Sequence, residues 1–181
     1  RTKMKFPRQE INKFLHRSDG LVGPKGRALC RFCAKELSVD RKETCSPECE
    51  LIMLLSWNPS FVRNFLYNRD KGVCAECGTN MDEVKKELMK LIAACKQDEF
   101  LVRCNQFGIS PNVFKGAKEG MGSFFSDSFW DADHRMPLKT IPECKTEILL
   151  KFLGPKNLQT LCIECHRVKS AEERKLDASD Y

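Results

Sequence analysis

The sequence predicts an α+β fold that is mainly helical. Amphipathic runs bordered by helix-start and helix-end residues recur along its 181 residues. Two short extended segments lie near the C-terminal end, and a chain of this length holds one or two domains. Close pairs of cysteines stand between these elements, at Cys30/Cys33, Cys45/Cys49, Cys74/Cys77 and Cys162/Cys165.

The positive charge of the chain is concentrated at its N-terminal end. Residues 1–30 contain eight lysines and arginines against two acidic residues, which equals the net charge of +6 of the whole chain. Such an arm suits contact with a polyanion, because Lys and Arg beside phosphates release counterions. A solvated, lysine-rich leader explains the same charge. With no signal peptide and no long apolar run, we expect a soluble fragment of a longer protein without a membrane partner.

Helix-start signals divide the first half of the chain. Residues 1–29 are expected to form a short helix or a loosely ordered arm. Ser46 followed by Pro47, and Asn58 followed by Pro59, each pair a capping residue with a proline suited to the first helical position. These two pairs therefore predict two consecutive helices.

The second half alternates between helical and extended patterns. The strongest helix is predicted over residues 81–97, where apolar residues form one stripe and Glu and Lys occupy the other face. A shorter helix is expected through residues 100–107, and most of the stretch up to residue 129 is expected to be loop. The remaining elements are an extended segment at 129–133, a helix at 142–155, a strand at 158–161 and a final helix at 163–176.

The first two cysteine pairs are expected to bind one structural zinc ion. Cys30-x2-Cys33 and Cys45-x3-Cys49 lie close in sequence, and the second pair spans the start of a helix. Without a secretory signal the thiols should stay reduced and available to zinc. Four ordinary cysteines that happen to lie near one another are the less favoured alternative. A site with four sulfur ligands has no open position, so its expected role is to stabilise a region with little core.

The other two pairs are expected to share a second structural zinc ion. Each lies in a short C-x-x-C knuckle, and no other partner pair remains once the first site is full. Two separate knuckles that bind nothing are the alternative. The cysteines of the second site are Cys74, Cys77, Cys162 and Cys165. Three further cysteines are expected to be small buried residues, namely Cys95, Cys104 and Cys144.

Two histidines near the C-terminal end are candidates for a catalytic site. Asp133 and His134 leave an extended segment, in which neighbouring side chains point to opposite faces, so Asp133 can bind a cation while His134 points elsewhere. His166 lies in the first turn of a helix that the second cysteine group would hold. A lone histidine is more often structural, so the hypothesis depends on the combination of these residues.

The stretches "WDADHRMPL" and "KNLQTLCIECHRVKS", together with "GVCAECG", resemble the HNH family of nucleases and its ββα-metal fold. The preceding "LCRFC…TCSPEC" and "FVRNFLYNRDKGVC" look like the lead-in of eukaryotic HNH domains. The expected organisation is a basic arm at residues 1–29, a four-cysteine zinc finger with a helix at 30–58 and, as the resemblance implies, an HNH domain at 59–181. That domain would carry a helical insertion at about 79–128. The stretch 139–156 departs from the family, because it looks helical where many members have a short Gly-rich loop.

The resemblance also implies a role for individual residues. His134 would be the general base, Asp133 and His166 would hold a catalytic divalent cation, and Asn157 would orient the loop around His134. This sparse ligand set leaves room for water and phosphate oxygens, so the expected cation is Mg²⁺ or Mn²⁺, with Ni²⁺ also accepted. Three cations are candidates for DNA phosphate contacts, with exposed surface cations as the alternative, namely Arg135, Arg167 and Lys169.

The expected function is hydrolysis of DNA phosphodiester bonds by an HNH endonuclease, selective for duplex or branched DNA. We expect it to be a nuclear module of a DNA-repair or replication-associated protein, with a helicase or ATPase module in the same parent chain. A catalytically inactive, zinc-stabilised module that binds DNA or protein is the main alternative. A cysteine-based redox enzyme is less favoured, because the paired spacing commits eight cysteines to zinc.

Overall fold

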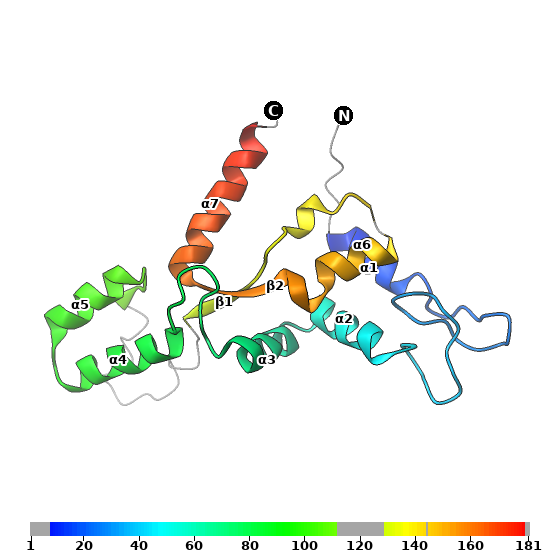
Figure 1. Cartoon of the computed structure of the whole chain (residues 1–181), viewed down its shortest axis with the longest axis horizontal. Coiled ribbons are helices and arrows are strands. Elements are labelled where there is room, and N and C mark those ends of the chain that lie inside the picture. The colour runs from blue at the N-terminus through cyan, green and yellow to red at the C-terminus, as the bar shows by residue number, and fades with distance from the viewer. Residues whose placement is uncertain (1–7, 112–128, 144, 180–181) are drawn as a thin grey trace. The chain divides into compact units, whose positions relative to one another are not determined.

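The computed structural model describes residues 8–111, 129–143 and 145–179, and helices dominate it (Figure 1). The helices are α1 (Arg8–His16), α2 (Pro47–Trp57), α3 (Pro59–Asp70), α4 (Met81–Ala93), α5 (Gln97–Gln106), α6 (Thr146–Leu153) and α7 (Ile163–Ser179). The 3-10 helices η2 (Leu138–Thr140) and η3 (Pro155–Asn157) accompany the strands β1 (Trp130–His134) and β2 (Leu158–Cys162) in the described part of the chain. The mainly helical α+β class is therefore confirmed. None of the described helices is both long and apolar enough to cross a membrane.

The chain divides into two compact units, and each is built from two separate segments. The first unit contains residues 1–65 and 134–158, and the second contains residues 66–133 and 159–181. The domain boundaries expected after residues 29 and 58 fall within the first unit and remain predictions.

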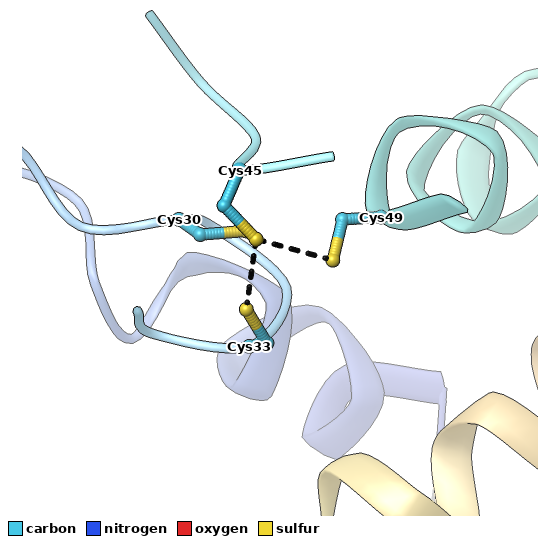
Figure 2. Close-up of side chains that lie close together, drawn as sticks. All are labelled: Cys30, Cys33, Cys45 and Cys49. Carbon is cyan, nitrogen blue, oxygen red and sulfur yellow. Dashed lines mark hydrogen bonds between the residues drawn. The ribbon is translucent and has the colours of Figure 1, made fainter. Parts of the chain in front are cut away.

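The first unit contains a finger-like segment that carries four cysteines. Isolated bridges between Val22 and Ala28 and between Leu29 and Glu36 fold this segment back on itself. Its cysteines come together around one point, with one of them on α2 (Figure 2). The helix starts here as the sequence predicts, because Ser46 accepts a hydrogen bond from the Cys49 backbone N–H at 3.3 Å.

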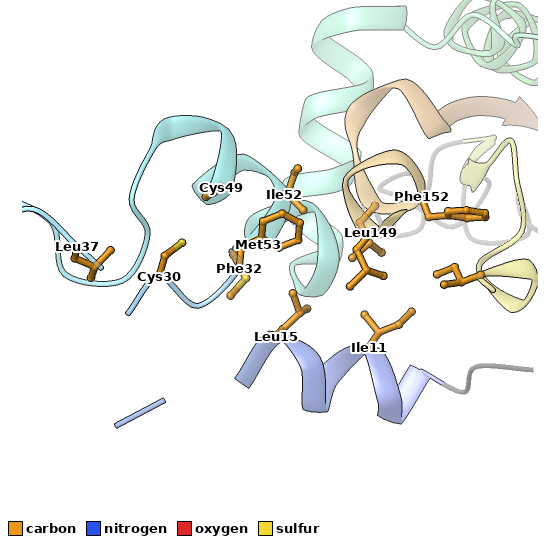
Figure 3. Close-up of a cluster of buried hydrophobic side chains, with 12 residues drawn as sticks. Ile11, Leu15, Cys30, Phe32, Leu37, Cys49, Ile52, Met53, Leu149 and Phe152 are labelled. Atoms are coloured by element: carbon orange, nitrogen blue, oxygen red, sulfur yellow. The ribbon is translucent and has the colours of Figure 1, made fainter. Parts of the chain in front are cut away.

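An apolar core joins the finger to the helices of the first unit (Figure 3). Ile11 and Leu15 of α1, Met53 of α2 and Leu149 of α6 meet there with Phe32 of the finger, and all five are buried. Each such side chain stabilises the fold by about 1.5–3 kcal/mol. The N-terminal segment is thus a helix packed on the core from at least residue 8, rather than a loose arm.

The second unit holds α4, α5, α7 and most of the two-stranded sheet, whose terminal residues His134 and Leu158 are assigned to the first unit. The sheet has the order β1–β2, and β2 is buried at every position. Its polar Thr160 is tolerated because the hydroxyl donates to Asp70 at the end of α3, at 2.8 Å. The chain turns after α3 through Gly72, whose φ of +76° lies in the left-handed region.

Two predicted helices are shorter than their sequence patterns. The pattern over 81–97 contains a turn, because Cys95 adopts a φ of +56° between α4 and α5. Helix α6 begins at Thr146 rather than at residue 142 and ends before Gly154. A Cβ at Gly154 would lie 2.4 Å from the Leu150 carbonyl oxygen, so only glycine fits this turn. The loop predicted beyond residue 111 lies outside the described residues.

Candidate functional site

The first four-cysteine group has the dimensions of a zinc site. The sulfurs of Cys30, Cys33, Cys45 and Cys49 all lie within 4.8 Å of one another. Sulfurs 33 and 45 are 3.3 Å apart, and sulfurs 45 and 49 are 3.7 Å apart (Figure 2). A tetrahedral zinc ion with bonds of about 2.3 Å separates its sulfur ligands by about 3.8 Å. The prediction that this group could hold zinc is therefore confirmed.

The thiols of this group differ in how readily they ionise. Burial opposes ionisation of Cys30, but hydrogen bonds from the backbone of Cys33, Cys45 and Phe32 outweigh it and lower its pKa to about 7. Burial raises the pKa of Cys49 to about 11. Zinc binds the thiolate, so Cys30 is better prepared than Cys49 to lose its proton.

The second four-cysteine group joins two parts of the chain that are far apart in sequence. The sulfurs of Cys74, Cys77, Cys162 and Cys165 all lie within 4.8 Å of one another, and sulfurs 77 and 162 are 3.9 Å apart. These spacings also suit zinc, which confirms the predicted grouping. The Ala75 N–H donates to the Thr160 carbonyl at 2.8 Å and ties the first knuckle to β2.

Of the remaining cysteines, Cys104 is buried as predicted. The same prediction is wrong for Cys95, which is exposed in the turn between α4 and α5. Cys95 lies within the helix predicted over residues 81–97, but α4 ends at Ala93, before this residue. Cys144 lies outside the described residues.

Asp133 and His166 lie together in the second unit, between β1 and the first turn of α7. The Asp133 Oδ1 atom is 3.9 Å from His166 Nε2. The opposite nitrogen, His166 Nδ1, is 3.0 Å from Asp131 Oδ2. Asp131 and Asp133 share one face of β1 because they are two residues apart on a strand. An acidic pair therefore faces one imidazole from both of its nitrogens.

The second oxygen of Asp133 is occupied by two donors. Gln159 Nε2 donates to Asp133 Oδ2 at 2.9 Å, and Lys169 Nζ lies 2.9 Å from the same oxygen. Lys169 also pairs with Glu173. Burial opposes the charge of Lys169, but its hydrogen bonds to Glu173 and Asp133 outweigh this and raise its pKa. Both donors bind Oδ2, and the other oxygen, Oδ1, is the one that faces His166.

Asn157 is held in the first unit, where it fixes the backbone that follows His134. Its side chain is buried and accepts from the Met136 N–H at 2.7 Å. It also donates to the carbonyls of Met136 and Phe152, at 3.0 and 2.8 Å. The Arg135 N–H donates to the Asn157 carbonyl at 2.7 Å. His134 itself ends β1 and follows Asp133 directly in the chain.

The two arginines predicted to contact DNA are exposed. Arg167 lies one turn after Glu164 on α7, and its Nε donates a hydrogen bond to Glu164 Oε2 at 3.0 Å. Lys169 is only 21% exposed and pairs with two carboxylates, so its surroundings differ from those of the two arginines.

Sequence reasoning did not single out Asp131 or Gln159. The signal was available in "WDAD", because alternation along a strand places Asp131 on the same side as Asp133. Gln159 gave no comparable signal, because a glutamine inside a short apolar strand indicates no particular partner. Its Oε1 atom is buried and has no hydrogen-bond partner within the described part of the chain.

The fold and the site together define a small helix–strand protein with two four-cysteine groups that could hold zinc and an acid–histidine cluster. The chain is similar to proteins described as "DNA annealing helicase and endonuclease ZRANB3". It is 26% identical to that of Bos taurus over 164 residues and 25% identical to that of Mus musculus over 165 residues. Each comparison covers 85% of this chain but only 14% of the relative's length. No family model and no solved structure matches the chain.

Proposed function

We propose that this chain is an HNH-type endonuclease domain that hydrolyses DNA phosphodiester bonds with a divalent cation. The observation that carries the proposal is the approach of Asp133 Oδ1 to His166 Nε2, at 3.9 Å, directly beside His134 in the chain. The distant relatives are described as helicase and endonuclease proteins, which supports action on DNA.

The donor set at Asp133 and His166 fits a catalytic cation. Adjacent octahedral ligands at about 2.1 Å from one ion lie about 3.0 Å apart, so Asp133 Oδ1 and His166 Nε2, now 3.9 Å apart, would approach by about 1 Å to share the ion. Gln159 Oε1 is a buried acceptor with no hydrogen-bond partner among the described residues, and water around an ion could satisfy it. Mg²⁺ and Mn²⁺ suit the carboxylate, and the imidazole also permits Ni²⁺. When bound, such an ion supplies positive charge that stabilises the phosphate oxygens during hydrolysis.

His134 acts as the general base in this proposal. A neutral imidazole has a nitrogen lone pair, so it takes a proton from the water that attacks phosphorus. The water oxygen bonds to phosphorus as the P–O3′ bond breaks, and the departing O3′ takes a proton from solvent, which leaves a 5′ phosphate and a 3′ hydroxyl. Asn157 positions His134 by fixing the backbone of Arg135 and Met136 that follows it. Both zinc ions are structural, because four sulfurs fill each coordination sphere.

The preferred substrate is duplex or branched DNA, bound through its phosphates. The exposed guanidinium groups of Arg135 and Arg167 are each available to contact a DNA phosphate. Lys169 balances the charge of the Asp133 cluster and contacts a phosphate only if it leaves its two carboxylates. Since the chain spans 14% of its relatives' length, we propose that it works in the nucleus beside a helicase or ATPase module.

A second candidate function is DNA or protein binding without catalysis. It is favoured by the ion pair between Lys169 Nζ and Asp133 Oδ2, because the ammonium already balances the charge of the carboxylate that would bind a catalytic cation. Under this candidate the acid–histidine cluster is a structural ion-pair network. If the wild-type chain binds DNA but cuts none with any divalent cation, the binding function is supported over the nuclease function.

The test is a cleavage assay on nicked, forked and plain duplex DNA, with Mg²⁺ or Mn²⁺ added to the zinc-loaded chain. His134→Ala should lower the rate by about 10²- to 10⁴-fold, which is the usual contribution of a general base. His16→Ala is the matched control, because His16 is an exposed histidine that pairs with Asp19. Equal rates for wild type and His134→Ala contradict the proposal.

A further inference from the structure

Each candidate ligand of the cation has its second polar atom occupied by a neighbouring side chain. The carboxylate of Asp133 gives Oδ2 to Gln159 and Lys169, and the imidazole of His166 gives Nδ1 to Asp131. The remaining atoms, Asp133 Oδ1 and His166 Nε2, are the two that approach each other. Such an arrangement selects one atom of each side chain for a metal.

We propose that Asp131 is a positioning residue that holds His166 in the tautomer able to bind the cation. This inference rests on the proposed nuclease function, which is the reaction that requires the cation. A neutral imidazole carries one N–H, and the other nitrogen keeps a lone pair. Because the Asp131 carboxylate accepts a hydrogen bond at 3.0 Å from Nδ1, the proton stays on Nδ1 and the lone pair on Nε2. Nε2 is the nitrogen that faces Asp133.

The backbone makes this contact specific. Asp131 and Asp133 lie on the same face of β1, and His166 lies in the first turn of α7. Cys162 and Cys165 anchor the start of that helix, since the Cys165 N–H donates to Cys162 Sγ at 3.4 Å. The strand therefore presents one carboxylate to each nitrogen of a ring whose helix is fixed.

General metal chemistry gives the expected size of the effect. Histidines that bind metals usually donate their other ring N–H to a carboxylate or carbonyl, and loss of that partner weakens metal binding by about 10- to 100-fold. Two other roles for Asp131 give different results. If Asp131 were a direct ligand, its replacement would abolish metal binding as replacement of Asp133 would. If Asp131 and His166, which are both partly exposed, formed only a surface ion pair, its replacement would leave metal affinity unchanged.

The experiment compares Asp131→Asn with wild type in the full, zinc-loaded chain. Calorimetric titration with Mn²⁺ should show affinity lowered by about 10- to 100-fold. Nitrogen NMR of His166, recorded without Mn²⁺, should show the proton on Nδ1 in wild type and redistributed between Nδ1 and Nε2 in the variant. Asp98→Asn is the matched control, because Asp98 is an exposed aspartate in the first turn of α5. It should leave both readings unchanged.

Three outcomes overturn the inference. An unchanged Mn²⁺ affinity together with an unchanged tautomer shows that Asp131 is a surface partner only. Loss of all Mn²⁺ binding, equal to that of Asp133→Asn, shows a direct ligand. A neutral wild-type ring with its proton on Nε2 shows that Asp131 does not hold the proton on Nδ1. Failure of the proposed function is distinct, because then wild type itself binds no Mn²⁺ and cuts no DNA.

Discussion

Asn157 and Met136 are joined by two hydrogen bonds between a buried side-chain amide and the backbone. The Met136 N–H donates to Asn157 Oδ1 at 2.7 Å, and Asn157 Nδ2 donates to the Met136 carbonyl at 3.0 Å. The paired contact fixes the chain two residues after His134. A side chain of one residue thereby controls the backbone that leads away from the proposed base.

Replacing Asn157 should impair both stability and cleavage. Asn157→Ala leaves the backbone groups of Met136 and the Phe152 carbonyl without their partner, and each buried unsatisfied group costs about 1–3 kcal/mol. Chemical denaturation should show this loss in the free energy of unfolding. Cleavage should also fall at a temperature where the variant is fully folded. A folded Asn157→Ala chain with wild-type activity argues against the positioning role.

Gly154→Ala should destabilise the turn that precedes Asn157. The added Cβ would lie 2.4 Å from the Leu150 carbonyl oxygen, so the end of α6 must shift, and Asn157 donates its own N–H to the Gly154 carbonyl at 3.0 Å. We expect a loss of about 1–3 kcal/mol in thermal unfolding experiments. Lys151→Ala, on an exposed position of α6, is the control and should change stability little. Equal melting temperatures for both variants contradict the close packing at Gly154.

Loss of one zinc ligand should remove one metal ion and no more. Cys30 is fully buried in the first four-cysteine group, so Cys30→Ser should lower the zinc content from two ions per chain to one. The first unit should then lose cooperative unfolding, because a structural zinc contributes directly to folding. Cys95→Ser replaces an exposed cysteine outside both groups and should retain both ions. Two ions retained by Cys30→Ser exclude the predicted site.

Cys104 should resist alkylation up to alkaline pH. Burial raises its pKa, which disfavours the reactive thiolate in the folded chain. Because the folded pKa exceeds the unfolded value, the stabilising contribution of this thiol is complete below about pH 8.5 and is lost as pH rises through the folded pKa. Iodoacetamide labelling at pH 8, followed by peptide mass spectrometry, should modify exposed Cys95 far faster than Cys104. Equal labelling rates in the zinc-loaded chain refute the predicted protection.

Local chemistry made several elements predictable from the sequence. A capping side chain followed by proline specifies a helix start without help from the rest of the fold, and α2 and α3 both begin at the proline of such a pair, after the caps Ser46 and Asn58. The second cysteine grouping was predicted by elimination, since only two pairs remained. Both predictions depend on spacing, which the sequence displays directly.

Contacts between distant residues were harder to predict. The break between α4 and α5 depends on a left-handed φ at Cys95, a residue type that gives no signal for such a turn. Gln159 became part of the cluster only because pairing of the strands brings β2 beside β1 and sets its side chain against Asp133. Strand alternation predicts that Asp131 shares a face with Asp133. It does not predict the partner of Asp131, because His166 lies 35 residues away in the chain.

The most direct test of the account is the rate at which the zinc-loaded chain cuts forked duplex DNA in the presence of Mn²⁺, compared between wild type and Asp133→Asn. The variant keeps the shape of the side chain and removes the charge that faces His166 Nε2 at 3.9 Å. We predict cleavage by wild type and none above background by the variant, with zinc content unchanged in both. Equal cleavage by the two chains would contradict the assignment of Asp133 and His166 as the cation site.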